Sequence, residues 1–236
     1  MPIIFTSKTS KIEKTGNMYK LIYENGENYS NFFEKIKKNL EIKKEEKGNY
    51  FTFQAVKVEP LKTLLKRKEG LSYRHLKELF TQIGKQFEGL EEDGYCNLFL
   101  EIEDIVRVEV DRFTQHGGSG ADIYFLYLNT TEFLPIKDKI TKITKPISKK
   151  NLFFSPELKK LKSFPKEIHM NSQLYSLALL VCYCGEWNKN KKVFKNIKHE
   201  LDTFREYLSN IENTKLYWSL LRCLQYNPRH RIYLYI

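Results

Sequence analysis

Apolar and polar residues follow two different periods along this chain, and the mixture predicts an α+β protein. Between Leu71 and Leu90, apolar side chains recur every three or four positions, which is typical of an amphipathic helix with one buried face. Residues 106–113 instead alternate between apolar and charged side chains, which indicates a half-buried strand. Residues 174–184 are apolar on nearly every side, so we expect them to form a buried central helix.

Other elements are predicted where residues with a clear preference gather. Strands are predicted from aromatic and β-branched residues at residues 3–5, 18–23, 50–56 and 122–128. Helices are predicted from apolar stripes at residues 30–40, 61–65, 194–208 and 216–224. Prolines break up any long helix between residues 137 and 166, so we expect that stretch to be loop-like.

Charge changes this picture by suggesting a class of partner. The chain has 40 Lys and Arg against 29 Asp and Glu, a formal net charge of +11. Such a surplus favours acidic partners, although lysine-rich usage can equally reflect an AT-rich genome. The segment Lys137–Lys166 concentrates the charge, since it holds ten lysines and two acids. It is a candidate surface for nucleic acid or another polyanion, and a solvated loop is the alternative interpretation.

Cysteine placement and hydropathy bear on metal binding and location. Cys182 and Cys184 lie in the apolar helix without a second Cys or His pair at ligand spacing, so we expect core thiols and no metal site. The first residues do not have the pattern of a signal peptide, and no apolar run reaches the about 18 residues that a membrane span needs. We therefore expect an intracellular protein with reduced cysteines.

Three separated pieces of the sequence resemble the C-lobe of a eukaryotic-type protein kinase. They are Ser155-Pro156-Glu157, the apolar helix after it, and the later Pro228-Arg229-His230-Arg231. In that family an A-P-E motif ends the activation segment, and its glutamate pairs with a late arginine. The resemblance implies a Glu157–Arg231 ion pair and a two-lobed α+β fold, with a β-rich N-lobe at 1–59 and a helical C-lobe at 60–236. The Lys- and Asn-rich composition is similar to that of degenerate kinases of large DNA viruses, which implies host cytoplasm or a virion.

The same resemblance implies that the catalytic positions have lost their chemistry. Where the family has H-R-D-L-x-x-x-N, Asn97 stands for the His, Phe99 for the catalytic Asp and Asp104 for the metal-binding Asn. Asn129 stands for the Asp of D-F-G, and Gln173 for the helix Asp that braces the catalytic loop. Phenylalanine cannot accept a proton, and a neutral amide is a poor magnesium ligand. From the sequence pattern alone, we expect Asp104 and its acidic neighbours to form a solvated bend.

Three hypotheses for function remain open from the sequence. The first is a pseudokinase that binds a protein partner and needs no cofactor. The second is an atypical serine/threonine kinase that binds ATP and magnesium through Lys20, Glu34 and Asp104. No G-x-G-x-x-G loop precedes Lys20 and Glu34, and solvated surface charges are the alternative interpretation of both. The third hypothesis is a basic nucleic-acid-binding protein.

Overall fold

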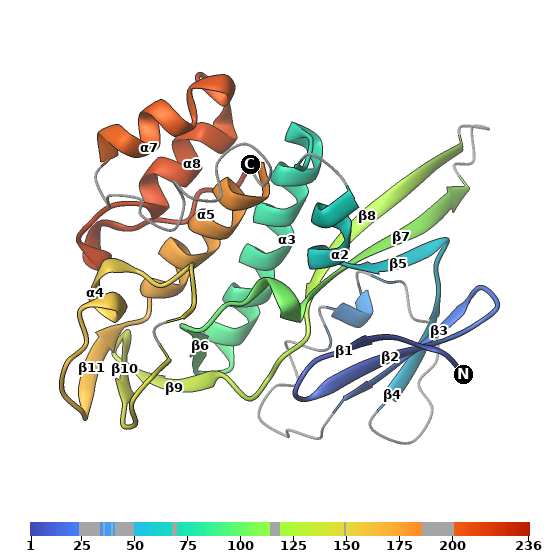
Figure 1. Cartoon of the computed structure of the whole chain (residues 1–236), viewed down its shortest axis with the longest axis horizontal. Coiled ribbons are helices and arrows are strands. Elements are labelled where there is room, and N and C mark those ends of the chain that lie inside the picture. Colours follow the sequence, from blue (N-terminus) through green and yellow to red (C-terminus); the bar gives the residue numbers. More distant parts are fainter. Residues whose placement is uncertain are drawn as a thin grey trace.

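The chain folds as an α+β protein with three antiparallel sheets and several helices (Figure 1). This computed structural model describes residues 1–23, 34, 36–38, 40, 50–67, 70–113, 119–148, 150–185 and 201–236. The predicted α+β class is therefore confirmed. Residues 30–33, 35 and 39 of the helix predicted at residues 30–40 lie outside the described residues.

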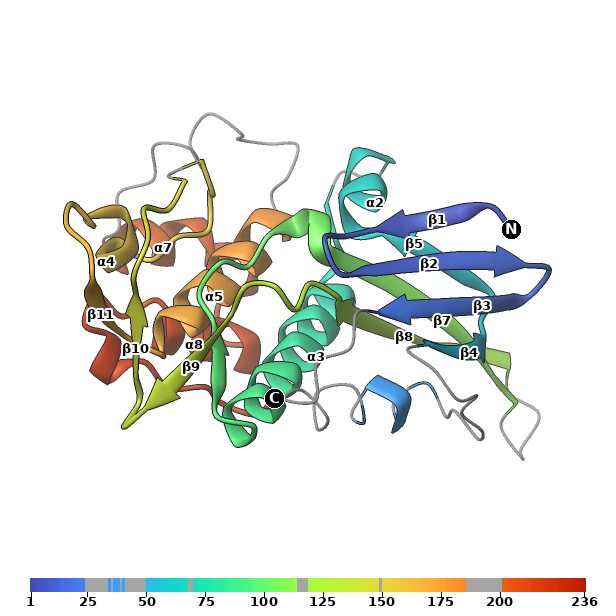
Figure 2. The same cartoon turned by 90° about the horizontal axis from the view of Figure 1, so that it is seen from below.

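The first sheet has the strand order β1-β2-β3-β4 and lies at one end of the molecule (Figures 1 and 2). Its strands are β1 (Ile3–Thr6), β2 (Ser10–Thr15), β3 (Met18–Tyr23) and β4 (Tyr50–Gln54). Tyr19 and Leu21 of β3 are buried, whereas their neighbour Lys20 is half-buried on the opposite face. The helical residues Glu34 and 36–38 precede β4. Strand β2 was not predicted, because five of its six residues are polar or charged in the pattern Ser-Lys-Ile-Glu-Lys-Thr.

The second sheet joins parts of the chain on both sides of the boundary predicted at 59/60. It contains β5 (Lys57–Pro60), β7 (Ile105–Phe113) and β8 (Ser119–Tyr127), in the order β5-β7-β8. Strand β5 runs through Pro60, which lies opposite Val106 at the strand end. Proline is tolerated at a strand end because the N–H that it lacks is not needed there for a hydrogen bond within the sheet. One hydrophobic core cluster runs from Phe5 to Leu224, so the described elements do not separate into two clear lobes.

The third sheet corrects the prediction that Lys137–Lys166 is loop-like. Its strands are β6 (Tyr95–Asn97), β9 (Phe133–Lys137), β10 (Ile140–Ile143) and β11 (Lys166–His169), in the order β11-β10-β9-β6. The short helix α4 (Pro156–Lys159) lies in the same stretch. Thr141 and Ile143 are buried while Lys142 is exposed, so β10 has the period of a strand. The many lysines hid that period.

The remaining helices are α2 (Leu61–Arg67), α3 (Tyr73–Glu92), α5 (Ser172–Gly185), α7 (Leu201–Tyr207) and α8 (Lys215–Cys223). Helices α3 and α8 pack on α5, the Tyr175 ring of α5 contacts Phe204 of α7, and α2 packs on β5 and β7. Short 3-10 turns form η2 (Ile102–Asp104), η3 (Ser209–Ile211) and η4 (Pro228–His230). Every residue of α5 before Gly185 is buried, as the sequence predicted. Figures 1 and 2 both place α3 between α5 and the β7–β8 hairpin.

The described helices contain no segment that is both long and apolar enough to cross a bilayer. The longest of them, α3, has a polar face opposite its apolar stripe. The apolar helix α5 has 14 residues, which is shorter than a typical span of about 20 residues.

The C-terminal segment packs on α3 at a point where only glycine fits. The Tyr233 ring stacks on Phe80 with centroids 5.1 Å apart, and its hydroxyl donates to the Thr81 carbonyl at 3.3 Å. A Cβ on Gly84 would overlap the same ring. The glycine is therefore selected by the approach of Tyr233 and not by the helix itself.

We predict that Gly84→Ala destabilises the protein, although alanine normally favours a helix interior by about 1 kcal/mol over glycine. The overlap with Tyr233 should lower the free energy of unfolding by roughly 1–3 kcal/mol, measured by urea denaturation. In a Tyr233→Ala background the overlap is absent, so the same glycine change should be neutral or stabilising. An equal loss in both backgrounds would contradict this account.

Candidate functional site

Four of the residues singled out from the sequence meet in one buried polar cluster. The cluster consists of Asn97, Asp104, Tyr127, Asn129 and Gln173, and each of these residues is less than a tenth exposed. They come from β6, η2, the end of β8 with the residues after it, and the first turn of α5. Strands β6 and β8 and helix α5 are all held by the main core, which fixes the cluster in place. Tyr127 was not singled out from the sequence.

Asp104 is the ionisable centre of the polar cluster. The Asn129 Nδ2 donates to its Oδ2 at 2.8 Å, and Asn129 Oδ1 in turn accepts from the Thr131 amide at 3.1 Å. Burial raises the pKa of Asp104 to about 6, although the Asn129 hydrogen bond lowers it and the charge of Glu101 adds to the rise. The predicted solvated bend is thus wrong for Asp104, because η2 turns its side chain inward, although Glu101 is exposed as expected.

Tyr127 places a second polar group beside Asp104. Its side chain is fully buried, and that burial together with the nearby Asp104 carboxylate raises the pKa of its hydroxyl well above the usual value. The hydroxyl therefore stays protonated across the physiological range. It can donate a hydrogen bond but cannot act as a base there.

Gln173 links helix α5 to strand β6. Its Oε1 accepts a hydrogen bond from the Asn97 amide at 3.1 Å, and Asn97 Oδ1 accepts from the Phe99 amide at 2.9 Å. All of Gln173 is buried except for 2% of its surface. An amide oxygen thus makes the brace that the resemblance assigned to a carboxylate, without placing a charge in the interior.

Phe99 lies outside the polar cluster and packs in a second hydrophobic cluster. Its ring is edge-on to that of Phe154, with centroids 6.0 Å apart. The buried members of this second cluster are Cys96, Leu98, Ile143, Phe154, Leu158, Leu161, Ile168 and Met170. The position that the resemblance gives to a catalytic acid is therefore occupied by a packed aromatic ring.

The turn between β1 and β2 covers the chain next to the polar cluster. The Ser7 hydroxyl donates to the Leu128 carbonyl at 2.9 Å, and the Thr130 amide donates to Thr9 Oγ1 at 2.9 Å. Lys8 Nζ lies 2.5 Å from Glu132 Oε1. The hydrogen bond to Glu132 raises the pKa of Lys8, and the charges of Glu132, Glu101 and Asp104 add to the rise. Figure 2 shows this turn at the end of the first sheet that faces α3.

Sequence reasoning missed this turn. The signal that could have found it is the run Thr6-Ser7-Lys8-Thr9-Ser10, whose short hydroxyl side chains commonly bond to backbone groups in turns. Nothing in the run indicates which distant backbone groups it meets. The contact with Leu128 joins residues 121 positions apart.

The two nucleotide candidates do not meet each other. Lys20 Nζ lies over the Tyr50 ring, 3.6 Å from its centroid. Glu34 accepts from Lys37 Nζ at 2.8 Å and is mostly exposed. Within the described residues no ion pair joins Lys20 to Glu34, and their role in binding phosphates stays a prediction.

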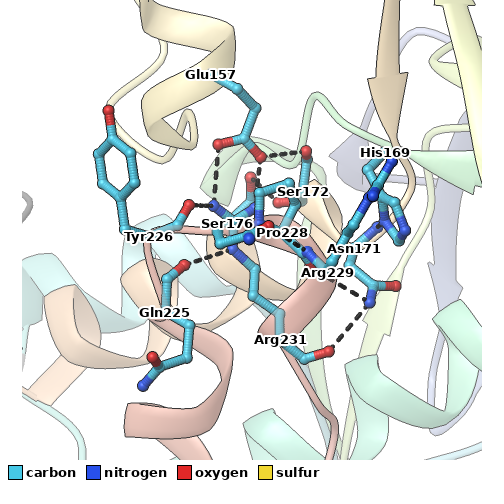
Figure 3. Close-up of polar contacts among 11 residues, drawn as sticks. Glu157, His169, Asn171, Ser172, Ser176, Gln225, Tyr226, Pro228, Arg229 and Arg231 are labelled. Carbon is cyan, nitrogen blue, oxygen red and sulfur yellow. Dashed lines mark hydrogen bonds and ion pairs between the residues drawn. The ribbon is translucent and has the colours of Figure 1, made fainter.

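The Glu157–Arg231 ion pair is present, as the sequence led us to expect (Figure 3). Arg231 Nη1 and Nη2 lie 2.5 Å and 2.9 Å from the two carboxylate oxygens, and Ser172 Oγ also donates to Glu157. Nε donates to the Gln225 carbonyl at 2.7 Å, and the guanidinium lies 4.7 Å from the Tyr175 ring centroid. The pair therefore connects α4, α5 and the residues that follow α8.

The environments of the two partners differ. The Arg231 side chain is fully buried, whereas that of Glu157 is 21% exposed. Burial pushes the pKa of Glu157 upward, but the hydrogen bonds and charge of Arg231 outweigh it, so the pKa lies below its usual value. The ionised carboxylate is the stable form in the folded protein at neutral pH.

Comparison of the sequence with protein-family models and with curated proteins found no match.

Across the part of the chain that the structure describes, no group of three or more His, Cys, Asp or Glu side chains is arranged to hold a metal ion. The four cysteines are all buried, and burial raises the pKa of the Cys96 and Cys182 thiols to about 12. These thiols are therefore protonated and pack as small apolar groups.

We predict that Glu157→Ala lowers the free energy of unfolding by roughly 3–5 kcal/mol, because it leaves the buried Arg231 charge without its partner. Glu167→Ala removes an exposed carboxylate ten residues away and should change stability by less than about 0.5 kcal/mol. Since the folded pKa of Glu157 is depressed, its contribution is complete above pH about 4.5 and is lost at lower pH. Chemical denaturation at pH 7 and below pH 4 tests both statements.

Asp104→Asn should have the opposite pH dependence. The folded pKa is raised from 3.8 to about 6, so between these values the unfolded state releases the proton first and stability falls as pH rises. The Asn variant removes this loss and should be more stable at pH 7, on the order of 2 kcal/mol, but not at pH 4. Asp111→Asn, on an exposed position of β7, is the matched control. A variant that is less stable than the parent at pH 7 would contradict the inferred burial cost.

Proposed function

We propose that this protein is a catalytically inactive member of the kinase-like class and that it acts by binding another protein. The single observation that carries the proposal is Phe99. Phosphoryl transfer to a hydroxyl needs a carboxylate that accepts or orients the proton. At this position the chain has a ring packed edge-on against Phe154 in the second hydrophobic cluster.

The β1–β2 turn gives the proposal independent support. In protein kinases a glycine-rich loop between the first strands covers the nucleotide phosphates. In this chain the corresponding turn is bonded to Leu128 and Thr130 through Ser7 and Thr9. Lys8 supplies a positive charge to the acidic groups near Asp104, where a kinase would place magnesium. The turn is thus bonded to the backbone and to Glu132 beside the polar cluster, in the place where a kinase loop would cover the nucleotide.

Two structural contacts among residues 97–231 also support a role as a binding scaffold. Arg231 holds α4 through Glu157, and Gln173 holds β6 through the Asn97 amide. Neither contact takes part in phosphoryl transfer. A protein selected for binding needs these contacts, because they position surface elements, and has no need for a proton acceptor.

Transfer of phosphate from radiolabelled ATP tests the proposal. We expect no incorporation above background into the protein itself or into a general acceptor, and no difference between the parent and Asp104→Ala. Magnesium-ATP should also leave the melting temperature unchanged. A ligand that binds the folded state, at 100 times its dissociation constant, would raise the free energy of unfolding by about 2.7 kcal/mol.

Two outcomes would contradict the proposal and favour the atypical kinase instead. One is incorporation that Asp104→Ala abolishes. The other is a magnesium-ATP stabilisation that disappears in both Lys20→Ala and Glu34→Ala, since those residues were identified as the candidates for holding the phosphates. Lys14→Ala, a half-buried lysine on the neighbouring strand β2, is the matched control.

A further inference from the structure

A groove of about 650 Å³ lies beside the Glu157–Arg231 pair and takes no part in the polar cluster. Its walls are α4 with the turn after it, strand β11, and the segment Tyr226–Pro228. In Figure 3 the Tyr226 side chain extends away from Arg231, to the left of Glu157. The side chains that matter for recognition are Lys160, Leu161, Lys162, Lys166, Ile168 and Tyr226.

The rim of the groove carries a surplus of positive charge. Lys160, Lys162 and Lys166 are exposed, and in the described part of the chain neither Lys162 nor Lys166 forms an ion pair. Glu157 is neutralised by Arg231, which leaves Glu167 as the opposing carboxylate on the lining. This charge pattern favours an acidic ligand.

His169 adds little charge to the groove. Burial lowers its pKa, and the charges of Lys139, Arg229 and Arg231 lower it further. The ring is therefore mostly neutral at pH 7, with Nδ1 accepting from the Asn171 amide at 3.2 Å. The positive charge of the rim comes from the lysines.

The floor of the groove is apolar, which narrows the class of ligand. Leu161 and Ile168 are buried beneath it, and Pro156 and Pro228 form stiff edges. Tyr226 is 57% exposed at the rim, with Lys160 Nζ 5.1 Å from its ring centroid and bonded to its hydroxyl. A free phosphate has nothing to place on an apolar floor, and single-stranded nucleic acid binds through successive aromatic platforms. A peptide segment with acidic and apolar side chains matches both the rim and the floor.

The ion pair sets the shape of this groove before any ligand arrives. Arg231 binds the Glu157 carboxylate in one wall and the Tyr226 carbonyl, at 2.9 Å, in the other. Both walls are thus held by one buried guanidinium. Preorganisation of this kind reduces the entropy that a ligand loses on binding.

We propose that the groove binds an acidic segment of a partner protein, with an apolar side chain on the Leu161–Ile168 floor and carboxylates at the three lysines. The proposal rests on the protein-binding function proposed above and names the surface and the chemistry of the partner. All three lysines of the rim, Lys160, Lys162 and Lys166, also belong to the basic segment that the sequence suggested for polyanions.

Fluorescence anisotropy with a labelled peptide tests the groove. The probe has one phenylalanine between two pairs of glutamates, and the comparison peptide has lysines in place of the glutamates. We expect the acidic peptide to bind and Lys162→Glu/Lys166→Glu to weaken it by about tenfold, because two rim charges are reversed. Lys85→Glu/Lys215→Glu makes the same change of net charge at exposed positions on α3 and α8 and should bind like the parent.

Tyr226→Ala and a peptide with serine in place of phenylalanine test the apolar part of the groove without changing charge. Each should weaken binding. Equal weakening by the two double variants, equal binding of the lysine peptide, or displacement by oligothymidine at lower concentration than by unlabelled peptide would overturn the proposal. A parent protein that does not bind the acidic peptide would also overturn it, while the ATP measurements decide the proposed function separately.

Discussion

The complete burial of one guanidinium is the constraint on which the larger part of this structure depends. A buried arginine must have its charge balanced and its donors bonded, or the cost of removing it from water is not recovered. Glu157 and the carbonyls of Gln225 and Tyr226 meet that requirement together, and the Tyr175 ring covers the flat face. Ser172 donates a further hydrogen bond to Glu157. These groups come from separate elements. The positions of α4 and of the residues after α8 are therefore limited to those that keep the contacts with Arg231.

The polar cluster solves a related problem with amides in place of charges. Asn97, Asn129 and Gln173 each bond a backbone amide or a carboxylate, so the junction of β6, η2 and α5 stays polar and specific. Amides do this at a lower desolvation cost than ionised groups. Asp104 is the remaining carboxylate, and its raised pKa reflects the cost that the amides avoid. The use of amides in place of carboxylates at this junction agrees with the proposed function.

Elements with a long, clean period could be predicted from the sequence, and contacts between distant residues could not. Helix α3 and strand β7 have stripes that only one local structure buries. Strand β2 has a single apolar residue, and β10 lies in a lysine-rich segment. Their alternation of apolar and polar residues was therefore too weak to predict a strand. The Glu157–Arg231 pair was expected from a resemblance to a family, since no local pattern relates residues 74 positions apart. The brace of Gln173 and the bonds of Ser7 and Thr9 depend on tertiary placement and have no signature in sequence spacing.

The β1–β2 turn is held in place chiefly by hydrogen bonds of uncharged hydroxyl groups. The nature of these bonds determines how the turn responds to the ionic strength of the solution. The bonds of Ser7 to Leu128 and of Thr130 to Thr9 involve no formal charge. Dissolved ions screen the exposed Lys8–Glu132 pair, but they act little on neutral groups bonded to backbone. The turn should therefore keep its place at ionic strengths that suppress long-range electrostatic attraction.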